Sequence, residues 1–90
     1  MKRIHVMVSG KVQGVGYRAW VARIGNLDGL SGWVKNSNDG GVEIVAEGEK
    51  EDLQVFADRL WDGPGGSQVE DVEIEWQEAT DEFVEFEVTY

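Results

Sequence analysis

Residues 10–18 read GKVQGVGYR, and they connect two segments whose apolar residues repeat with different periods. Before them, apolar residues alternate with other residues from Ile4 to Val8, which is typical of a strand with one buried face. After them, apolar residues recur at helical spacing. The predicted helical face consists of Trp20, Val21, Ile24 and Leu27. A strand, a glycine-rich loop and a helix that begins near Tyr17 are therefore expected at the start of the chain.

The rest of the sequence predicts four further strands and a second helix. The strands are expected over residues 31–35, 42–47, 71–76 and 84–90, and the helix over residues 50–61. Asp39-Gly40 lies between the first two of these strands and is a hairpin signal. The order β-α-β-β-α-β with an additional C-terminal strand predicts an α+β fold, the ferredoxin-like α/β sandwich. We expect one domain over residues 1–90, with an antiparallel or mixed sheet and both helices on one face.

The end of the first helix and the packing of the tryptophans are further expectations. Gly25 inside the helix costs about 1 kcal/mol relative to Ala, and Asp28-Gly29 is the expected stop. Trp20, Trp61 and Trp76 fall on apolar faces, so the pattern predicts that they are core aromatics.

The composition argues against several classes of function. A net charge of −10 at pH 7 argues against nucleic acid or an anionic membrane as the main partner. No apolar run approaches ~18 residues, so we expect no membrane-spanning segment. Without cysteine there is no disulfide framework and no thiolate metal site. The carboxylates alternate along the last strands, which indicates a solvated face, and we expect no metal. A cytoplasmic monomer is the expectation.

The charges are distributed unevenly along the chain. Residues 1–45 hold six Lys and Arg against three Asp and Glu, a net charge of +3. Residues 46–90 hold two Lys and Arg against fifteen Asp and Glu, a net charge of −13. Any site for an anion is therefore expected in the first half.

The glycine-rich loop has the features of an anion site. Gly10, Gly14 and Gly16 let the backbone curl so that successive N–H groups point into one concavity. The helix after the loop adds the positive end of its dipole. Arg18 in the first helical turn is unfavourable against that dipole, unless an anion binds its planar, two-pronged guanidinium. These residues predict a phosphate or carboxylate site; the alternative is a simple turn with a surface arginine.

Two other phosphate-binding motifs are alternatives for this loop. The P-loop pattern fails because no Gly-Lys-Ser or Gly-Lys-Thr occurs in the chain. The dinucleotide pattern G-x-G-x-x-[G/A] matches at Gly14, Gly16 and Ala19. A dinucleotide domain needs a parallel βαβ array, however, whereas this chain continues from its second strand into a hairpin.

Asn36 is the second candidate residue, at the end of the second predicted strand. An asparagine there is usually a turn former. Periodicity alone does not show whether this strand end approaches the loop.

Taken together, two segments resemble the signatures of a known enzyme family. Residues 10–18 resemble the pattern G-x-V-Q-G-V-x-[F/Y]-R of the acylphosphatases. Residues 32–43 resemble their second pattern, G-x-V-[R/K]-N-x-x-D-G-x-V-E, at a fitting separation. The resemblance implies the ferredoxin-like fold, hydrolysis of a small-molecule acyl phosphate, and no cofactor.

The resemblance also implies roles for particular residues. The phosphate-binding loop maps to Gln13, Gly14, Val15, Gly16, Tyr17 and Arg18, and the catalytic residues map to Arg18 and Asn36. Inorganic phosphate, the product, is expected to inhibit competitively. The family commonly has Ala where Gly25 stands and an apolar residue where Asp28 stands, so the end of the first helix departs from its pattern.

The implied chemistry needs positioning and charge stabilisation more than acid–base groups. Arg18 stays protonated and Asn36 is neutral, so neither is a base. Asn36 would hold the attacking water, whose proton would pass to the phosphate itself. His5, the only histidine, lies in a strand. A non-catalytic anion-sensing domain remains the alternative, whereas RNA binding would need a basic sheet with exposed aromatics.

Overall fold

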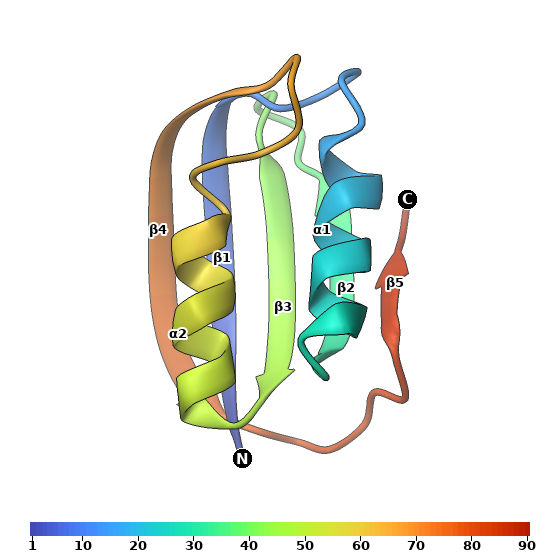
Figure 1. Cartoon of the computed structure of the whole chain (residues 1–90), viewed down its shortest axis with the longest axis vertical. Helices are drawn as coiled ribbons and strands as arrows, with labels where there is room; N and C mark the ends of the chain where they lie inside the picture. Colours follow the sequence, from blue (N-terminus) through green and yellow to red (C-terminus); the bar gives the residue numbers. More distant parts are fainter.

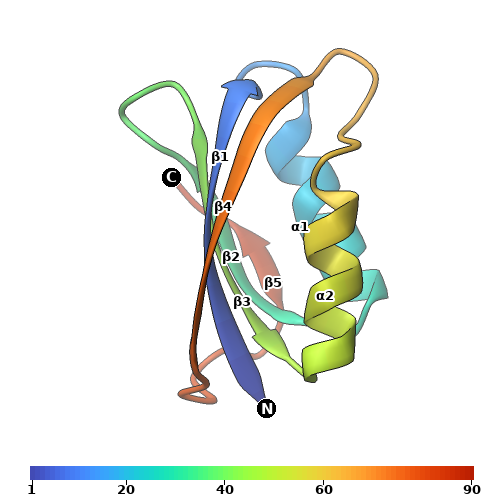
Figure 2. The ribbon, with the colours of Figure 1, turned by 90° about the vertical axis from the view of Figure 1, so that its left-hand side faces the viewer.

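The computed structural model, which describes residues 1–90, contains the seven elements in the predicted order (Figure 1). They are β1 (Lys2–Lys11), α1 (Tyr17–Leu27), β2 (Ser31–Asn36), β3 (Val42–Gly48), α2 (Lys50–Arg59), β4 (Gln68–Glu78) and β5 (Phe86–Val88). The strands form one sheet in the order β4-β1-β3-β2-β5. All neighbours are antiparallel except β5, which runs parallel to β2. Figure 2 shows both helices on the same face of the sheet, so the predicted ferredoxin-like sandwich is confirmed.

The strand order places the glycine-rich loop beside the end of β2. Both β1 and β2 are antiparallel to β3, which lies between them. Their C-terminal ends therefore lie at the same end of the sheet. Helix α1 packs over β2 and β5. The chain from β1 to α1 therefore passes the β2–β3 hairpin at this end of the sheet, at the top of Figure 1.

Alternating residues of β1 form the centre of the core. Ile4, Val6 and Val8 are at most 1% exposed and face the helices. Leu53 and Phe56 of α2 belong to the same buried cluster and are fully buried. Burial of each such side chain stabilises the fold by about 1.5–3 kcal/mol, so the apolar period of β1 fixes which face the helices cover.

The C-terminal turn of α1 explains the glycine within this helix. A Cβ on Gly25 would lie 2.5 Å from the ring of Phe86, so only glycine lets β5 approach the helix this closely. The helix ends at Leu27, as the expected stop at Asp28 predicts. Leu27 itself is 75% exposed, and its predicted place on the buried face is wrong. The buried residues of this helix are instead Tyr17, Val21, Ala22, Ile24 and Gly25.

Asn26 attaches the edge strand β5 to the same helical turn. Its side-chain amide donates to the carbonyl oxygen of Phe86 at 3.1 Å and accepts from the Phe86 N–H at 2.9 Å. One asparagine thus pairs both outward backbone groups of an edge residue that has no further strand beside it.

Two of the tryptophans are not core residues. Trp76 is 44% exposed and Trp61 is 49% exposed, so their predicted burial is wrong. Trp20 is half-buried against the core. The reason for Trp76 is the sheet order: α2 packs over β1 and β3, so the helical face of the edge strand β4 lies outside its cover.

The last two strands differ from their predicted lengths. β4 extends over Gln68–Glu78, because it pairs along the whole of β1. β5 covers only Phe86–Val88, and Val84 is 97% exposed before it. Neither helix of the chain is long and apolar enough to cross a membrane.

Candidate active site

The loop between β1 and α1 presents a row of unpaired backbone donors. Gly14 and Gly16 have φ of 74° and 81°, in the left-handed region that glycine enters without strain. No side chain caps the N-terminus of α1. None of the backbone N–H groups from Gln13 to Ala19 donates a hydrogen bond within the protein. Together with the helix dipole, these donors make a site for an anion.

Arg18 lies at this site without a carboxylate partner. It is half-buried in the first turn of α1 and takes part in none of the ion pairs of the structure. Its guanidinium carbon lies 4.9 Å from the centre of the Tyr90 ring, and its Nη1 makes a long, weak hydrogen bond of 3.5 Å to the Thr89 carbonyl oxygen. The end of the chain thus orients the guanidinium but leaves its charge free for a ligand. A pocket of 210 Å³ opens here, lined by residues that include Gly14, Gly16 and Arg18.

Tyr17 contributes its backbone to the loop, while its side chain points into the core. The ring is 1% exposed, and the hydroxyl donates to the Leu60 carbonyl oxygen at 2.7 Å. Burial raises the pKa of Tyr17, so the hydroxyl stays protonated and keeps this bond. The bond attaches the start of α1 to the end of α2 and so fixes the position of the helical end of the loop.

The side chain of Gln13 binds the neighbouring hairpin. Its Nε2 donates to the carbonyl oxygens of Ser37 at 3.0 Å and Gly41 at 2.7 Å. The sequence placed Gln13 in the phosphate loop, and the structure adds that its amide reaches across to the turn after Asn36.

Asn36 is the last residue of β2 and pairs with Val42 of β3, at the same end of the sheet as the loop. Its Oδ1 is buried and has no hydrogen-bond partner in the protein. Leaving a buried acceptor unpaired costs about 1–3 kcal/mol. Such a cost is typical of functional residues, although Asn36 is not among the residues that line the pocket at the loop.

The turn that follows Asn36 is held by an aspartate. Asp39 accepts hydrogen bonds from the Ser37 hydroxyl and from the Gly41 N–H, the latter at 3.1 Å. The Ser37 bond, followed by the Gly41 bond, lowers the pKa of Asp39, so the carboxylate stays ionised and keeps the turn closed.

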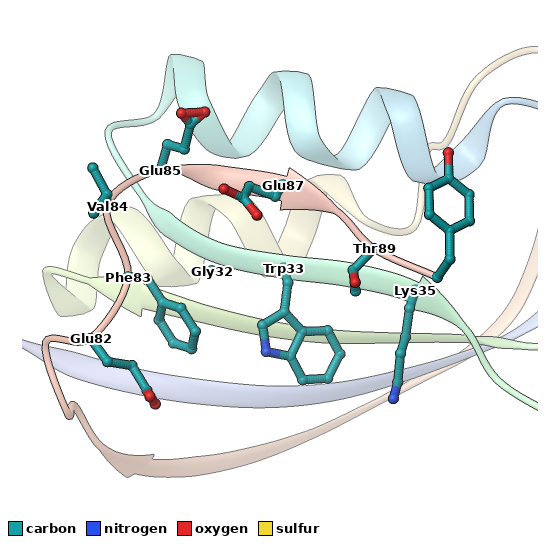
Figure 3. Close-up of a pocket in the computed structure, with 10 residues that line it drawn as sticks. Gly32, Trp33, Lys35, Glu82, Phe83, Val84, Glu85, Glu87 and Thr89 are labelled. Carbon is teal, nitrogen blue, oxygen red and sulfur yellow. The ribbon is translucent and has the colours of Figure 1, made fainter.

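The largest cavity of the protein lies elsewhere, on the helix-free face of the sheet. It measures 460 Å³, and Trp33 of β2 and Phe83 lie next to each other along it (Figure 3). Lys35 is its only basic lining residue. Its acidic lining residues are Glu82, Glu85 and Glu87. Because carboxylates outnumber the single lysine, this groove repels an anion, and the smaller pocket at the loop is the candidate active site.

No three His, Cys, Asp or Glu side chains lie close enough together to hold a metal ion. His5 pairs with Glu43 at 2.7 Å on the helix-free face of the sheet, where both are partly exposed.

Some residues of the site gave no sequence signal. The stacking of Tyr90 on Arg18 and the attachment of Gln13 to Ser37 and Gly41 join segments far apart in the chain. The motif gave the position of Gln13 in the loop, but neither periodicity nor motif gives the direction of its side chain.

Comparison with known proteins agrees with this geometry. The sequence model of one family, described as Acylphosphatase, matches residues 4–88. An acylphosphatase of Methylococcus capsulatus is 46% identical over 88 residues, which cover 98% of this chain and 96% of the relative. One of Thermus thermophilus is 49% identical over 78 residues, which cover 87% of this chain and 89% of the relative. The crystal structure of acylphosphatase from Bacillus subtilis matches with a TM-score of 0.96 and 37% identity over all of both chains. The chain belongs to the acylphosphatase family, whose members are hydrolases of acyl phosphates.

Proposed function

We propose that this chain hydrolyses small acyl phosphates at the loop of residues 13–18, with Asn36 holding the attacking water. The observation that supports this most directly is that the loop and Asn36 lie at the same end of the sheet. The unpaired N–H donors come from the loop and the start of α1, as does Arg18, which has no carboxylate partner. The unpartnered Oδ1 of Asn36 comes from the end of β2.

The loop and Arg18 supply phosphate binding and charge stabilisation. The N–H groups and the guanidinium bind the non-bridging oxygens of the phosphoryl group, whose charge is redistributed in the transition state. Arg18 suits this task because its fork contacts two oxygens at once. It stays protonated, so it takes no part in proton transfer.

Asn36 supplies the position of the nucleophile. Its Oδ1 accepts a hydrogen bond from the water and holds it in line with the bond that breaks. The water oxygen forms a bond to phosphorus as the carboxylate leaves with the electron pair of the P–O bond. Because no base lies at the site, the water proton passes to a phosphate oxygen, and the carboxylate needs no acid because it is a good leaving group.

The proposal has consequences for inhibitors and for the state of the protein. Inorganic phosphate binds the same N–H groups as the substrate and inhibits competitively. The activity belongs to one domain of residues 1–90, which works as a monomer and without a metal. A cytoplasmic location is part of the proposal and rests on the cysteine-free composition.

The second candidate is an anion-binding domain that lacks catalysis. It would use the same N–H groups and Arg18, but it would have no use for a buried, unpartnered amide oxygen on β2. That atom favours the hydrolase.

Hydrolysis of benzoyl phosphate, followed by ultraviolet absorbance, tests the proposal. We expect turnover that survives excess EDTA, because no cluster of ligands holds a metal. Restoration of a chelated sample by Mg²⁺ or Zn²⁺ would overturn the metal-free mechanism.

Substitution of Arg18 tests the phosphate site. Arg18→Ala and Arg18→Lys should each lower kcat/KM by about 10²–10³, because a point charge does not replace a two-pronged contact. Arg23→Ala is the matched control: it removes the same charge from an exposed position of α1 and should keep wild-type kinetics. Near wild-type kinetics in Arg18→Lys would remove Arg18 from the site.

A further inference from the structure

The two halves of the proposed site come from segments that the sheet does not join directly. The phosphate loop follows β1, whereas Asn36 ends β2, and β3 lies between these strands. Phosphoryl transfer depends on the distance between the phosphate and the water, so some contact must fix the loop relative to Asn36.

Gln13 makes the only hydrogen bonds between residues 12–18 and residues 36–41. Its amide nitrogen donates one hydrogen bond to the Ser37 carbonyl oxygen at 3.0 Å and another to the Gly41 carbonyl oxygen at 2.7 Å. Ser37 follows Asn36 directly, and Gly41 precedes Val42, the residue that pairs with Asn36 across the hairpin. The amide therefore binds both sides of the turn, next to the last strand pair, Asn36 and Val42.

The chemistry of this contact requires a glutamine amide or an equivalent double donor. Both partners are carbonyl oxygens, which only accept, and the amide nitrogen has two hydrogens to donate. A carboxylate or an apolar side chain of the same size has none.

We infer that Gln13 is a positioning residue, which sets the distance between the phosphate loop and the water held by Asn36. This inference rests on the proposed function. It differs from the role of the loop in phosphate binding, because the side chain holds the turn next to Asn36 and the backbone binds the anion. A misplacement of about 1 Å costs on the order of 10²-fold in rate, so loss of this contact should appear in kcat.

The hairpin should survive the loss of the Gln13 amide. Both carbonyls have a second donor from the backbone: the Ser37 N–H to Gly41 at 3.0 Å, and the Gly40 N–H to Ser37 at 3.4 Å. Gly41 also packs closely on β1, since a Cβ there would lie 2.4 Å from the Val8 carbonyl oxygen. A variant that keeps the volume of Gln13 and removes only its donors is therefore expected to fold.

Gln13→Met is that variant, and Gln13→Ala is the second. We expect either to lower kcat for benzoyl phosphate by about 10- to 100-fold, with the Ki of inorganic phosphate within about threefold of wild type. Gln77→Met is the matched control, because the Gln77 amide donates only to Glu75 on the edge strand β4, and it should keep wild-type kcat. A fall in phosphate affinity equal to the fall in kcat would overturn the inference, since Gln13 would then support the anion site alone.

A double-mutant cycle with Asn36 distinguishes a positioning role of Gln13 from a merely structural one, because it measures whether the two losses of kcat depend on each other. If Gln13 acts through Asn36, Gln13→Met should lower kcat by less than about twofold in an Asn36→Ala background. Multiplicative losses in the double variant would contradict the inference. Arg18→Ala separates this result from the proposed function: if Arg18→Ala is inactive while Gln13→Met is fully active, only the inference on Gln13 fails. If Arg18→Ala is active, the proposed function fails instead.

Discussion

Glu47 of β3 is a charged residue that the catalytic proposal does not use, although it is only 1% exposed. Its carboxylate accepts from the Arg3 guanidinium at 2.7 Å, from the Thr80 N–H at 2.9 Å and from the Asp81 N–H at 3.1 Å. These bonds attach the segment between β4 and β5 to the helix-free face of the sheet. That segment leads into β5 and then to Thr89 and Tyr90, so Glu47 supports the end of the chain that contacts Arg18.

The stability contributed by Glu47 should depend on pH. Burial raises the pKa of Glu47, but the bonds from Thr80, Arg3 and Asp81 outweigh burial and leave the pKa below its usual range. A lowered pKa in the folded state gives stability that is present above the unfolded value, about 4.3, and is lost as pH falls through the folded value. Glu47→Gln should therefore cost about 1.5–3 kcal/mol at pH 7 and progressively less below about pH 4.

Urea unfolding of wild type and Glu47→Gln between pH 3 and pH 8 measures this difference. Glu73→Gln, on the exposed edge strand β4, is the control and should change stability little at any pH. A difference between wild type and Glu47→Gln that stays constant over the range would show that the charge of Glu47 contributes nothing.

At the residue scale, the sequence predicted the positions of Arg18 and Asn36 but not the contacts of Gln13. Periodicity placed Arg18 in the first turn of a helix and Asn36 at the end of a strand, whereas their assignment to one site came from the resemblance to the family. The bonds of Gln13 join residues 24 and 28 positions apart, and such contacts depend on how the strands are ordered. The motif likewise does not give the direction of the Tyr17 side chain, which is buried in the core and bonds the Leu60 carbonyl oxygen at the end of α2.

At the scale of elements, α1 and β5 depend on each other through Gly25 and Phe86. Gly25→Ala adds helix propensity worth about 1 kcal/mol, but its Cβ would lie 2.5 Å from the Phe86 ring. Overpacking of this kind costs about 1–3 kcal/mol, so we expect net destabilisation in chemical unfolding. Phe86→Leu alone should destabilise, and in that background Gly25→Ala should become neutral or stabilising. An increase in stability from Gly25→Ala alone would show that propensity outweighs the clash.

The elements that the sequence predicted well are those with many apolar residues in period. β1 and α2 have buried faces that repeat regularly, and both lie where they were expected, except that α2 ends at Arg59 rather than at residue 61. β5 and the face of β4 were predicted less well, because both lie at sheet edges. The apolar pattern of Ile74 and Trp76 is the same as that of a core strand, and only the position of α2 leaves them 40% and 44% exposed.

At the scale of the whole molecule, the anion must reach a protein with a net charge of −10. Lys11 and Arg18 on either side of the loop take part in no ion pair, so they attract the substrate at short range. Salt screens the distant carboxylates more than these local charges, because the Debye length is about 10 Å at 0.1 M. Raising sodium chloride from very low levels to roughly 0.3 M should therefore leave kcat/KM unchanged or increase it.

The same screening should raise the melting temperature, since it relieves repulsion among the fifteen acidic residues after residue 45. A sodium chloride series that records kcat/KM and melting temperature together tests both effects; sulfate is unsuitable because it mimics phosphate. A steep fall in kcat/KM at unchanged phosphate Ki would mean that local attraction alone governs the encounter.

The division of labour between the phosphate loop and Asn36 is tested most directly by one variant. For Asn36→Ala, kcat for benzoyl phosphate and the Ki of inorganic phosphate should be measured on the same preparation. Because the loop holds the phosphate and Asn36 holds only the water, we expect kcat to fall by about 10²–10³ while Ki stays within about twofold of wild type. Equal losses of kcat and phosphate affinity, or a kcat near that of wild type, would contradict the account.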